Sequence, residues 1–263
     1  MTEIWRGTWV VSYRELLRFV NERSRLVGSF AQPLLFLVIF GAGFGNLIGS
    51  LAPGVDFIQF MYPGIIAMGV LTTSLFAGVS VVWDREFGFL RELLVAPLGR
   101  AGIVLGKAIG ACVVAVLQVF LMLLIAPVVG VDLDVGMVAL LVPVVFVLSI
   151  ALSGLGILIA SFMRSQQGFQ LLIQLLVFPL IFLAGVFFPI NQAPDWLQAL
   201  SKFNPLTYGV DAIRQVFLGS DAAASLGVTV GGHIMTLPEE VALMAAFAIV
   251  LLGAAVWGFN RQE

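Results

Sequence analysis

Apolar residues occur in six long runs along the chain, and polar or charged residues gather in the segments between them. Each run has about the 20 residues that a helix needs to cross the hydrocarbon core of a bilayer. We therefore predict six transmembrane helices, at residues 27–48, 58–82, 102–129, 136–162, 169–188 and 238–259. The first run follows a polar-rich segment and is too long for the apolar part of a signal peptide, so we expect no cleavable signal.

The composition agrees with this pattern. Of the 263 residues, 60% are hydrophobic and only 11% are charged, whereas a soluble domain has about 25% charged residues. The expected fold class is an all-α polytopic membrane protein, with residues 1–263 forming a single transmembrane domain. The net charge of −2 gives no indication of nucleic-acid binding. The one cysteine, Cys112, lies in an apolar run, which excludes a disulfide framework and a cysteine-pair metal site.

Lysine and arginine are distributed unevenly between the two sides of the predicted bundle. Of the 13 basic residues, 11 lie in the N-terminal segment, the loops after the second and fourth spans, the mouth of the third span (Lys107) or the C-terminal tail. The other side holds only Lys202 and Arg214, both in its longest loop. Because cytoplasmic loops carry the excess of basic residues, we predict that both termini are cytoplasmic.

The N-terminal segment, residues 1–26, has an apolar face and a basic face. One helical stripe carries Trp5, Trp9, Tyr13, Leu16 and Val20. Another face carries Arg14 and Arg18. This pattern predicts an amphipathic helix in the cytoplasmic interface of the membrane. The helix serves either as a membrane anchor alone or also as a brace for a soluble partner.

The cytoplasmic loop at residues 83–100 combines an apolar stripe with charges of both signs. The stripe, at helical spacing, consists of Phe87, Leu90, Leu93 and Leu94. Glu86, Arg91 and Glu92 lie off the stripe, and Pro97 and Gly99 end the predicted helix. A short helix of this kind can dock in a groove on another protein. The alternative is a solvated connector that only satisfies the positive-inside rule.

The extracytoplasmic segment at residues 189–237 is too apolar for a free loop, and its prolines divide it into short pieces. Short re-entrant helices between the fifth and sixth spans would explain this pattern. Asp211 and Arg214 are spaced at i, i+3 on one such helix. Because charges in the membrane need a partner, we expect these two side chains to form an ion pair.

Glycine recurs at every fourth residue at two places, Gly102–Gly106–Gly110 and Gly41–Gly45–Gly49. Faces of small residues let helices approach closely. The sequence leaves open whether each face packs within the chain or at a dimer seam.

Several functions are disfavoured by what the predicted spans lack. They offer glutamine, asparagine, serine and threonine but no acidic residue at mid-membrane, which argues against an ion-coupled carrier. The only Gly-Lys pair, Gly106-Lys107, is not part of a phosphate-binding loop. The single histidine, His233, lies in an outer loop, where a solvated side chain is expected, so an intramembrane enzyme is disfavoured. Energy for any transport should come from another chain.

These segments together resemble a known family. The matching stretches are "FGNLIGS" at 44–50, "MYPGIIAMGV" at 61–70, "REFGFLRELLVAPLGR" at 85–100 and "LAGVFFPINQAPDWLQALSKFNPLTYGVDAIR" at 183–214. The chain resembles the type-2 permease subunit of ATP-binding-cassette transporters, close to the daunorubicin-resistance and nodulation-factor exporter permeases.

The resemblance implies a fold like that of the G-subfamily exporters and a complex of two permeases, expected as a homodimer, with two ATPase subunits in the bacterial cytoplasmic membrane. ATP and Mg²⁺ would be bound by the ATPase partner, so that this chain is not an enzyme and has no cofactor of its own. The loop would be a coupling helix. The residues expected to contact the ATPase are Glu86, Phe87, Leu90, Arg91, Glu92 and Leu93 in the loop, with Arg14 and Arg18 in the interfacial helix.

The resemblance also implies an export path between two permeases, lined mainly by spans two and five. The candidates are Thr72, Thr73, Phe76 and Ser80 on span two, with Gln174, Phe178, Phe182 and Phe187 on span five. Ordinary helix packing is the other interpretation of each. A largely uncharged, aromatic path suits amphipathic or hydrophobic cargo such as a drug or a lipid-linked compound. The alternatives are a polysaccharide or glycolipid permease, a channel or carrier that works alone, and a membrane scaffold that binds an ATPase without moving cargo.

Overall fold

Long apolar helices make up most of the computed structural model, which describes residues 2–21, 23–48, 57–87, 100–130, 133–219, 227–230 and 233–261. The long helices are α1 (Thr2–Asn21), α2 (Arg23–Ile48), α3 (Phe57–Leu75), α4 (Ala77–Glu86), α6 (Arg100–Leu123), α7 (Val135–Phe162), α8 (Gln166–Leu183) and α12 (Leu237–Asn260). The shorter elements are the 3₁₀ turns η1 (Ala126–Val129) and η2 (Ile190–Gln192), the helices α9 (Asp195–Ser201) and α10 (Pro205–Leu218), and the strands β1 (Thr229–Val230) and β2 (His233–Ile234).

Among the described residues, five stretches of helix are long and apolar enough to cross a membrane: Phe57–Glu86, Ala101–Leu123, Val135–Phe162, Gln166–Leu183 and Leu237–Phe259. They confirm predicted spans two to six. The predicted first span falls on α2, whose described apolar part, Ala31–Gly43, is shorter. The chain is thus multi-pass and essentially helical.

The boundaries differ from the prediction at turn-forming residues. The second span is not one helix, because α3 and α4 are separated at Phe76. The third ends at Leu123 and is followed by η1, which has a proline in its first turn. The fifth ends at Leu183, shortly before Gly185, whose φ of 68° suits glycine.

One short β-ladder accompanies the helices, between α10 and α12. β1 and β2 pair antiparallel, with Thr229 opposite Ile234 and Val230 opposite His233. The ladder pairs backbone groups of these residues outside the helices.

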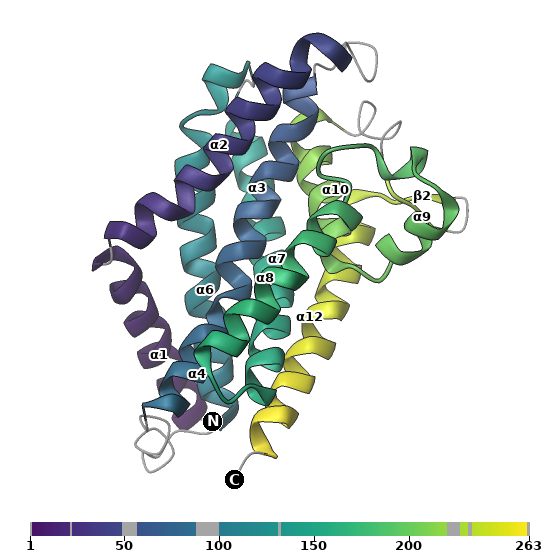
Figure 1. Ribbon diagram of the computed structural model, residues 1–263. Helices are drawn as coiled ribbons and strands as arrows, with labels where there is room; N and C mark the ends of the chain where they lie inside the picture. Colours follow the sequence, from purple (N-terminus) through teal and green to yellow (C-terminus); the bar gives the residue numbers. More distant parts are fainter. Residues whose placement is uncertain are drawn as a thin grey trace.

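The helices are arranged around α3, most of whose side chains are buried. α12 lies along α7, and α1 lies along α6 (Figure 1). Both termini and the end of α4 lie at one end of the bundle, whereas α9, α10 and β2 lie toward the other (Figure 1). A single continuous core therefore joins every spanning helix.

α1 is seated on the glycine face of α6. A Cβ atom on Gly106 would lie 2.7 Å from Cβ of Val11, and one on Gly110 would lie 2.8 Å from Cβ of Glu15. The Ser12 hydroxyl donates to the Gly106 carbonyl at 2.9 Å. This glycine face therefore packs within the chain, against the N-terminal helix.

Two further glycines bring α3 and α4 against α7. A Cβ on Gly156 would overlap the carbonyl oxygen of Leu75, and one on Gly78 would overlap the carbonyl of Gly156. We expect Gly156→Val to lower the free energy of unfolding by about 1–3 kcal/mol or more, because backbone atoms cannot yield to the added carbons. Detergent-induced unfolding in mixed micelles measures this effect. Gly253→Val is the control, since a Cβ there meets no atom within 4 Å; equal stability of the two variants would contradict the prediction.

Candidate functional site

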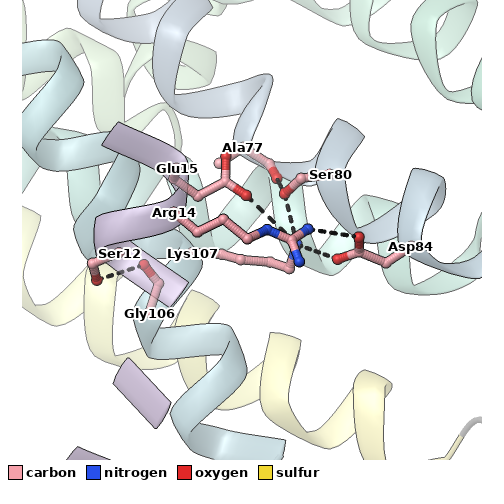
Figure 2. Close-up of polar contacts among 8 residues, drawn as sticks. All are labelled: Ser12, Arg14, Glu15, Ala77, Ser80, Asp84, Gly106 and Lys107. Carbon is pink, nitrogen blue, oxygen red and sulfur yellow. Dashed lines mark hydrogen bonds and ion pairs between the residues drawn. The ribbon is translucent and has the colours of Figure 1, made fainter. Parts of the chain in front are cut away.

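A buried cluster of charges joins α1, α4 and α6 near the end of α4 (Figure 2). The Lys107 ammonium donates to Asp84 Oδ2 at 2.7 Å and to the Ser80 hydroxyl at 2.8 Å, and it lies 3.8 Å from Glu15 Oε1. Arg14 Nη2 donates to Asp84 Oδ1 at 3.1 Å. The cluster thus balances two cations against two carboxylates. We call these four charged residues the Lys107 cluster.

Burial of Lys107 was not predicted from the sequence, which indicated a basic residue at the mouth of a span. Its side chain is only 2% exposed, and that of Asp84 is 6% exposed. The sequence did contain an indication of a buried pair. Asp84 lies just after the apolar run of span two, and Lys107 lies shortly after the start of span three. Only the packing of the two spans shows that these side chains meet.

The residues predicted to contact an ATPase gather in part around one groove. Arg14, Arg18 and Phe87 all line an open groove of about 570 Å³ beside Trp83. The Arg18 guanidinium lies 4.5 Å from the centre of the Trp83 ring. Phe87 is 67% exposed. The groove thus presents the Phe87 ring and the guanidinium groups of Arg14 and Arg18 at the end of the bundle.

The other predicted contacts differ in their placement. Glu86 is exposed, and its carboxylate accepts a hydrogen bond from the Gln166 backbone N–H at 3.1 Å. Leu90, Arg91, Glu92 and Leu93 lie outside the described residues. Glu86 therefore has an intramolecular partner at the start of α8 that the sequence did not indicate.

A cavity of about 390 Å³ lies among α1, α2, the α3–α4 break and α8. All four predicted path residues of span two line it: Thr72, Thr73, Phe76 and Ser80. Four amide side chains line it as well: Gln32, Gln118, Gln166 and Gln170. Thr73 donates a hydrogen bond to Gln118 Oε1. Gln166 and Gln170 were not among the predicted site residues, because the sequence does not indicate which face of span five meets span two.

Trp83 contributes aromatic surface to this cavity. Its Nε1–H is buried and has no hydrogen-bond partner among the described residues.

The predicted path residues of span five do not line the cavity. Gln174, Phe178 and Phe182 are exposed on α8. Phe187 lies beyond the end of α8, with its ring centre 4.9 Å from Phe40 and 5.6 Å from Phe182. Gln167, Gln170, Gln174 and Phe178 share one exposed stripe of α8 at helical spacing. Three amides on a membrane-spanning face favour a polar or protein neighbour over lipid.

Asp211 and Arg214 are both buried in α10. Arg214 Nη1 lies 3.9 Å from Asp211 Oδ1, Arg214 Nη2 donates to the Gly185 carbonyl at 3.0 Å, and the guanidinium stacks 4.1 Å over the Phe60 ring. Burial lowers the pKa of Arg214 to about 10, while the negative charges of Asp211 and Glu240 act in the opposite direction. Arg214 therefore stays positively charged at neutral pH.

Glu240 is a third member of this outer cluster, and the sequence analysis missed it. It is fully buried and accepts a hydrogen bond from Gln215 Nε2 at 3.0 Å. It lies near the start of predicted span six, and the sequence does not indicate which side chains it meets. His233, in contrast, is exposed and pairs with Glu239 at 3.1 Å. Among the described residues, no group of three or more His, Cys, Asp or Glu side chains could hold a metal ion.

Comparison with known proteins places these features in a family. The family described as ABC-2 type transporter matches residues 6–218. The chain is 35% identical over 215 residues to the putative transport permease ycf38 of Cyanophora paradoxa, covering 80% of this chain and 73% of that protein. It is 28% identical over 218 residues to nodulation protein J of Rhizobium leguminosarum bv. trifolii, covering 82% and 80%. It is 32% identical over 167 residues to the probable multidrug ABC transporter permease YbhR of Escherichia coli (strain K12), covering 63% and 45%.

The family match covers most of the chain and includes the Lys107 cluster, the cavity and α10. It confirms the resemblance seen in the sequence. Permeases of this class work with ATP-binding subunits and are not themselves ATPases, in keeping with the absence of a phosphate-binding loop from the sequence. The chain therefore belongs to the ABC-2 type transporter family, as a multi-pass transmembrane permease subunit.

Proposed function

We propose that this permease is the transmembrane subunit of an ATP-driven exporter that moves an amphipathic compound out across the membrane. The observation that carries the proposal is the 390 Å³ cavity within the bundle, where the four candidate residues of span two meet amides from three other helices. Its size is that of a small-molecule site, about 300–1,000 Å³. Phe76 and Trp83 offer apolar surface, and the amides and hydroxyls offer hydrogen bonds. A drug-like or lipid-linked molecule has both kinds of surface.

The names of the relatives support a transport function but indicate no single cargo. YbhR is named as a probable multidrug permease, and nodulation protein J is named for nodulation. Amides and hydroxyls in the cavity wall also suit a glycolipid or polysaccharide, which we keep as the second candidate.

We further propose that the working complex contains two permeases and two ATPases in a bacterial cytoplasmic membrane. The amide stripe on α8 supports a second copy of this chain on that face, which would complete a path with Gln174, Phe178, Phe182 and Phe187.

α2 would supply the sixth span. The end of the bundle that holds both termini would be cytoplasmic, in agreement with the distribution of basic residues.

The ATPase would dock at that same end. The groove lined by Arg14, Arg18 and Phe87 presents cations and an aromatic ring, beside the loop at 83–100 that supplies Leu90, Arg91, Glu92 and Leu93. Bound lipid would cover the exposed aromatic residues of α1, Trp5, Trp9 and Tyr13. Loop and interfacial helix together would form the ATPase-binding surface.

Filling the cavity should weaken the response to cargo. We expect Thr72→Phe to raise about tenfold the concentration of a polyaromatic amphipathic dye that half-maximally stimulates ATP hydrolysis, an effect of about 1.4 kcal/mol. The Thr72 hydroxyl donates only within its own helix, to Met68 and Gly69 carbonyls, so the substitution removes no contact between helices. The measurement uses the permease copurified with its ATPase in lipid nanodiscs.

Val250→Phe, at an exposed position of α12, is the matched control and should respond like the wild type. An unchanged response of Thr72→Phe would exclude the cavity as the cargo site. Stimulation by a glycolipid but by no dye would favour the second candidate. Copurification without stimulation by either would indicate a scaffold.

A further inference from the structure

The last residues of α4 hold the turn between α7 and α8. Arg85 Nη1 donates to the Met163 carbonyl at 2.6 Å and to the Ser161 carbonyl at 3.3 Å. These carbonyls belong to the last turn of α7 and to the residue after it, where no helical N–H follows to bond them. Glu86 accepts from the N–H of Gln166, the first residue of α8. Arg85 and Glu86 are neighbours in α4, and they thus bind the end of α7 and the start of α8.

The charges of these two residues match the helix ends that they bind. The C-terminal end of a helix carries partial negative charge and favours a cation, and the N-terminal end favours an anion. Arg85 lies at the C-terminal end of α7, and Glu86 lies at the N-terminal end of α8. Only residues 163–165 separate the two helices. We call the contacts of Arg85 and Glu86 with this turn the α4 clasp.

α8 has few other attachments near this end. Its buried side chains are Phe169, Ile173 and Ile181. Of these, Phe169 contacts the region of Gly78 on α4, so the first turns of α8 are attached to α4 on two sides. The rest of the helix exposes its amide stripe, which the proposed function places on the export path. A displacement of the end of α4 would therefore move the first turns of α8 with it.

The clasp lies at the start of the 83–100 loop, which the proposed function assigns to the ATPase. α4 ends at Glu86, Phe87 is the last residue of this described stretch, and the loop continues to residue 100. On the α1 and α6 side, the preceding residue Asp84 is held by Arg14 and Lys107. Force applied to the loop must pass through Asp84, Arg85 and Glu86 before it reaches the rest of α4.

We propose that the α4 clasp transmits movement of the 83–100 loop to α8, so that Arg85 and Glu86 are positioning residues that couple ATP hydrolysis to the export path. The inference rests on the proposed function. It assigns Glu86 an intramolecular role in place of contact with the ATPase, and it assigns a role to Arg85, which the sequence analysis left without one.

Hydrogen–deuterium exchange tests this role without knowledge of the cargo. The full chain, copurified with its ATPase in lipid nanodiscs, is compared in the absence of nucleotide and after trapping with ATP, Mg²⁺ and vanadate. In the wild type we expect trapping to change deuterium uptake in residues 166–175 of α8. In Glu86→Ala we expect this nucleotide-dependent difference to be largely lost, because α8 no longer follows α4, while ATP hydrolysis continues. A purely structural cap would speed exchange equally in both states and leave the difference intact.

Two variants control the measurement. Arg164→Ala removes an exposed cation from the same turn and should keep the wild-type difference. Glu86→Gln keeps an acceptor oxygen for the Gln166 N–H, so it should fold like the wild type and retain part of the difference. An undiminished difference in Glu86→Ala, or no change at α8 in the wild type when the loop peptides do change, would overturn the inference. Failure of any ATPase to copurify would instead contradict the proposed function, and it would be seen before exchange is measured.

Discussion

Lys107→Met should lower the free energy of unfolding by about 3–5 kcal/mol, the loss typical when one partner of a buried ion pair is removed. The ammonium group is 2.7 Å from Asp84 and is almost completely buried. Methionine fills much of the same volume, so the loss would come from the carboxylates of Asp84 and Glu15, which lose their buried cation, rather than from a cavity. Unfolding of the purified permease in mixed micelles, followed by circular dichroism, measures the change.

The matched control lies on the same carboxylate. Arg14 also pairs with Asp84, at 3.1 Å, but its side chain is 47% exposed. We expect Arg14→Met to cost only about 0–1 kcal/mol, since water screens an exposed pair and solvates what remains. Addition of Asp84→Asn to Lys107→Met should restore part of the loss, because it removes the unpaired charge. Equal losses in Lys107→Met and Arg14→Met would show that burial does not govern the strength of this cluster.

Arg214→Met should have an effect of similar size at the other end of the bundle. The substitution leaves the carboxylate of Asp211, which is 1% exposed, without the cation that it pairs with. It also removes the hydrogen bond to the Gly185 carbonyl and the stacking on Phe60. We expect a loss of about 3–5 kcal/mol, measured by the same unfolding assay.

Two further variants distinguish a charge effect from a packing effect in this cluster. Among the described residues, Asp211 is the carboxylate within ion-pair distance of Arg214, so Glu240→Gln leaves the Asp211–Arg214 pair intact and should cost far less than Arg214→Met. In the double variant, Asp211→Asn should recover part of the loss caused by Arg214→Met, because it removes the buried carboxylate that has lost its partner. No recovery in the double variant would indicate that the stacking and the Gly185 contact, rather than charge, make Arg214 necessary.

The candidate site shows which inferences a single sequence supports. The family resemblance implied Thr72, Thr73, Phe76 and Ser80 of span two, and all four line one cavity in the structure. Their partners Gln166 and Gln170 could not be identified from the sequence, because helical periodicity within α8 does not determine which face meets α4. The bond of Glu86 to Gln166 could not be predicted either, because it joins residues 80 positions apart.

The sequence by itself determined that this protein is a multi-pass helical membrane protein, where five of its spans lie and which family it resembles. These properties depend on the length of apolar runs, on the placement of basic residues and on local motifs, all of which are read along the chain. Only the tertiary structure decided that Lys107 is buried against Asp84, that Glu240 joins Asp211 and Arg214, and that Arg85 and Glu86 bind the turn between α7 and α8. Each of these contacts joins different helices, and the energy of a buried charge depends on the partner that packing brings to it.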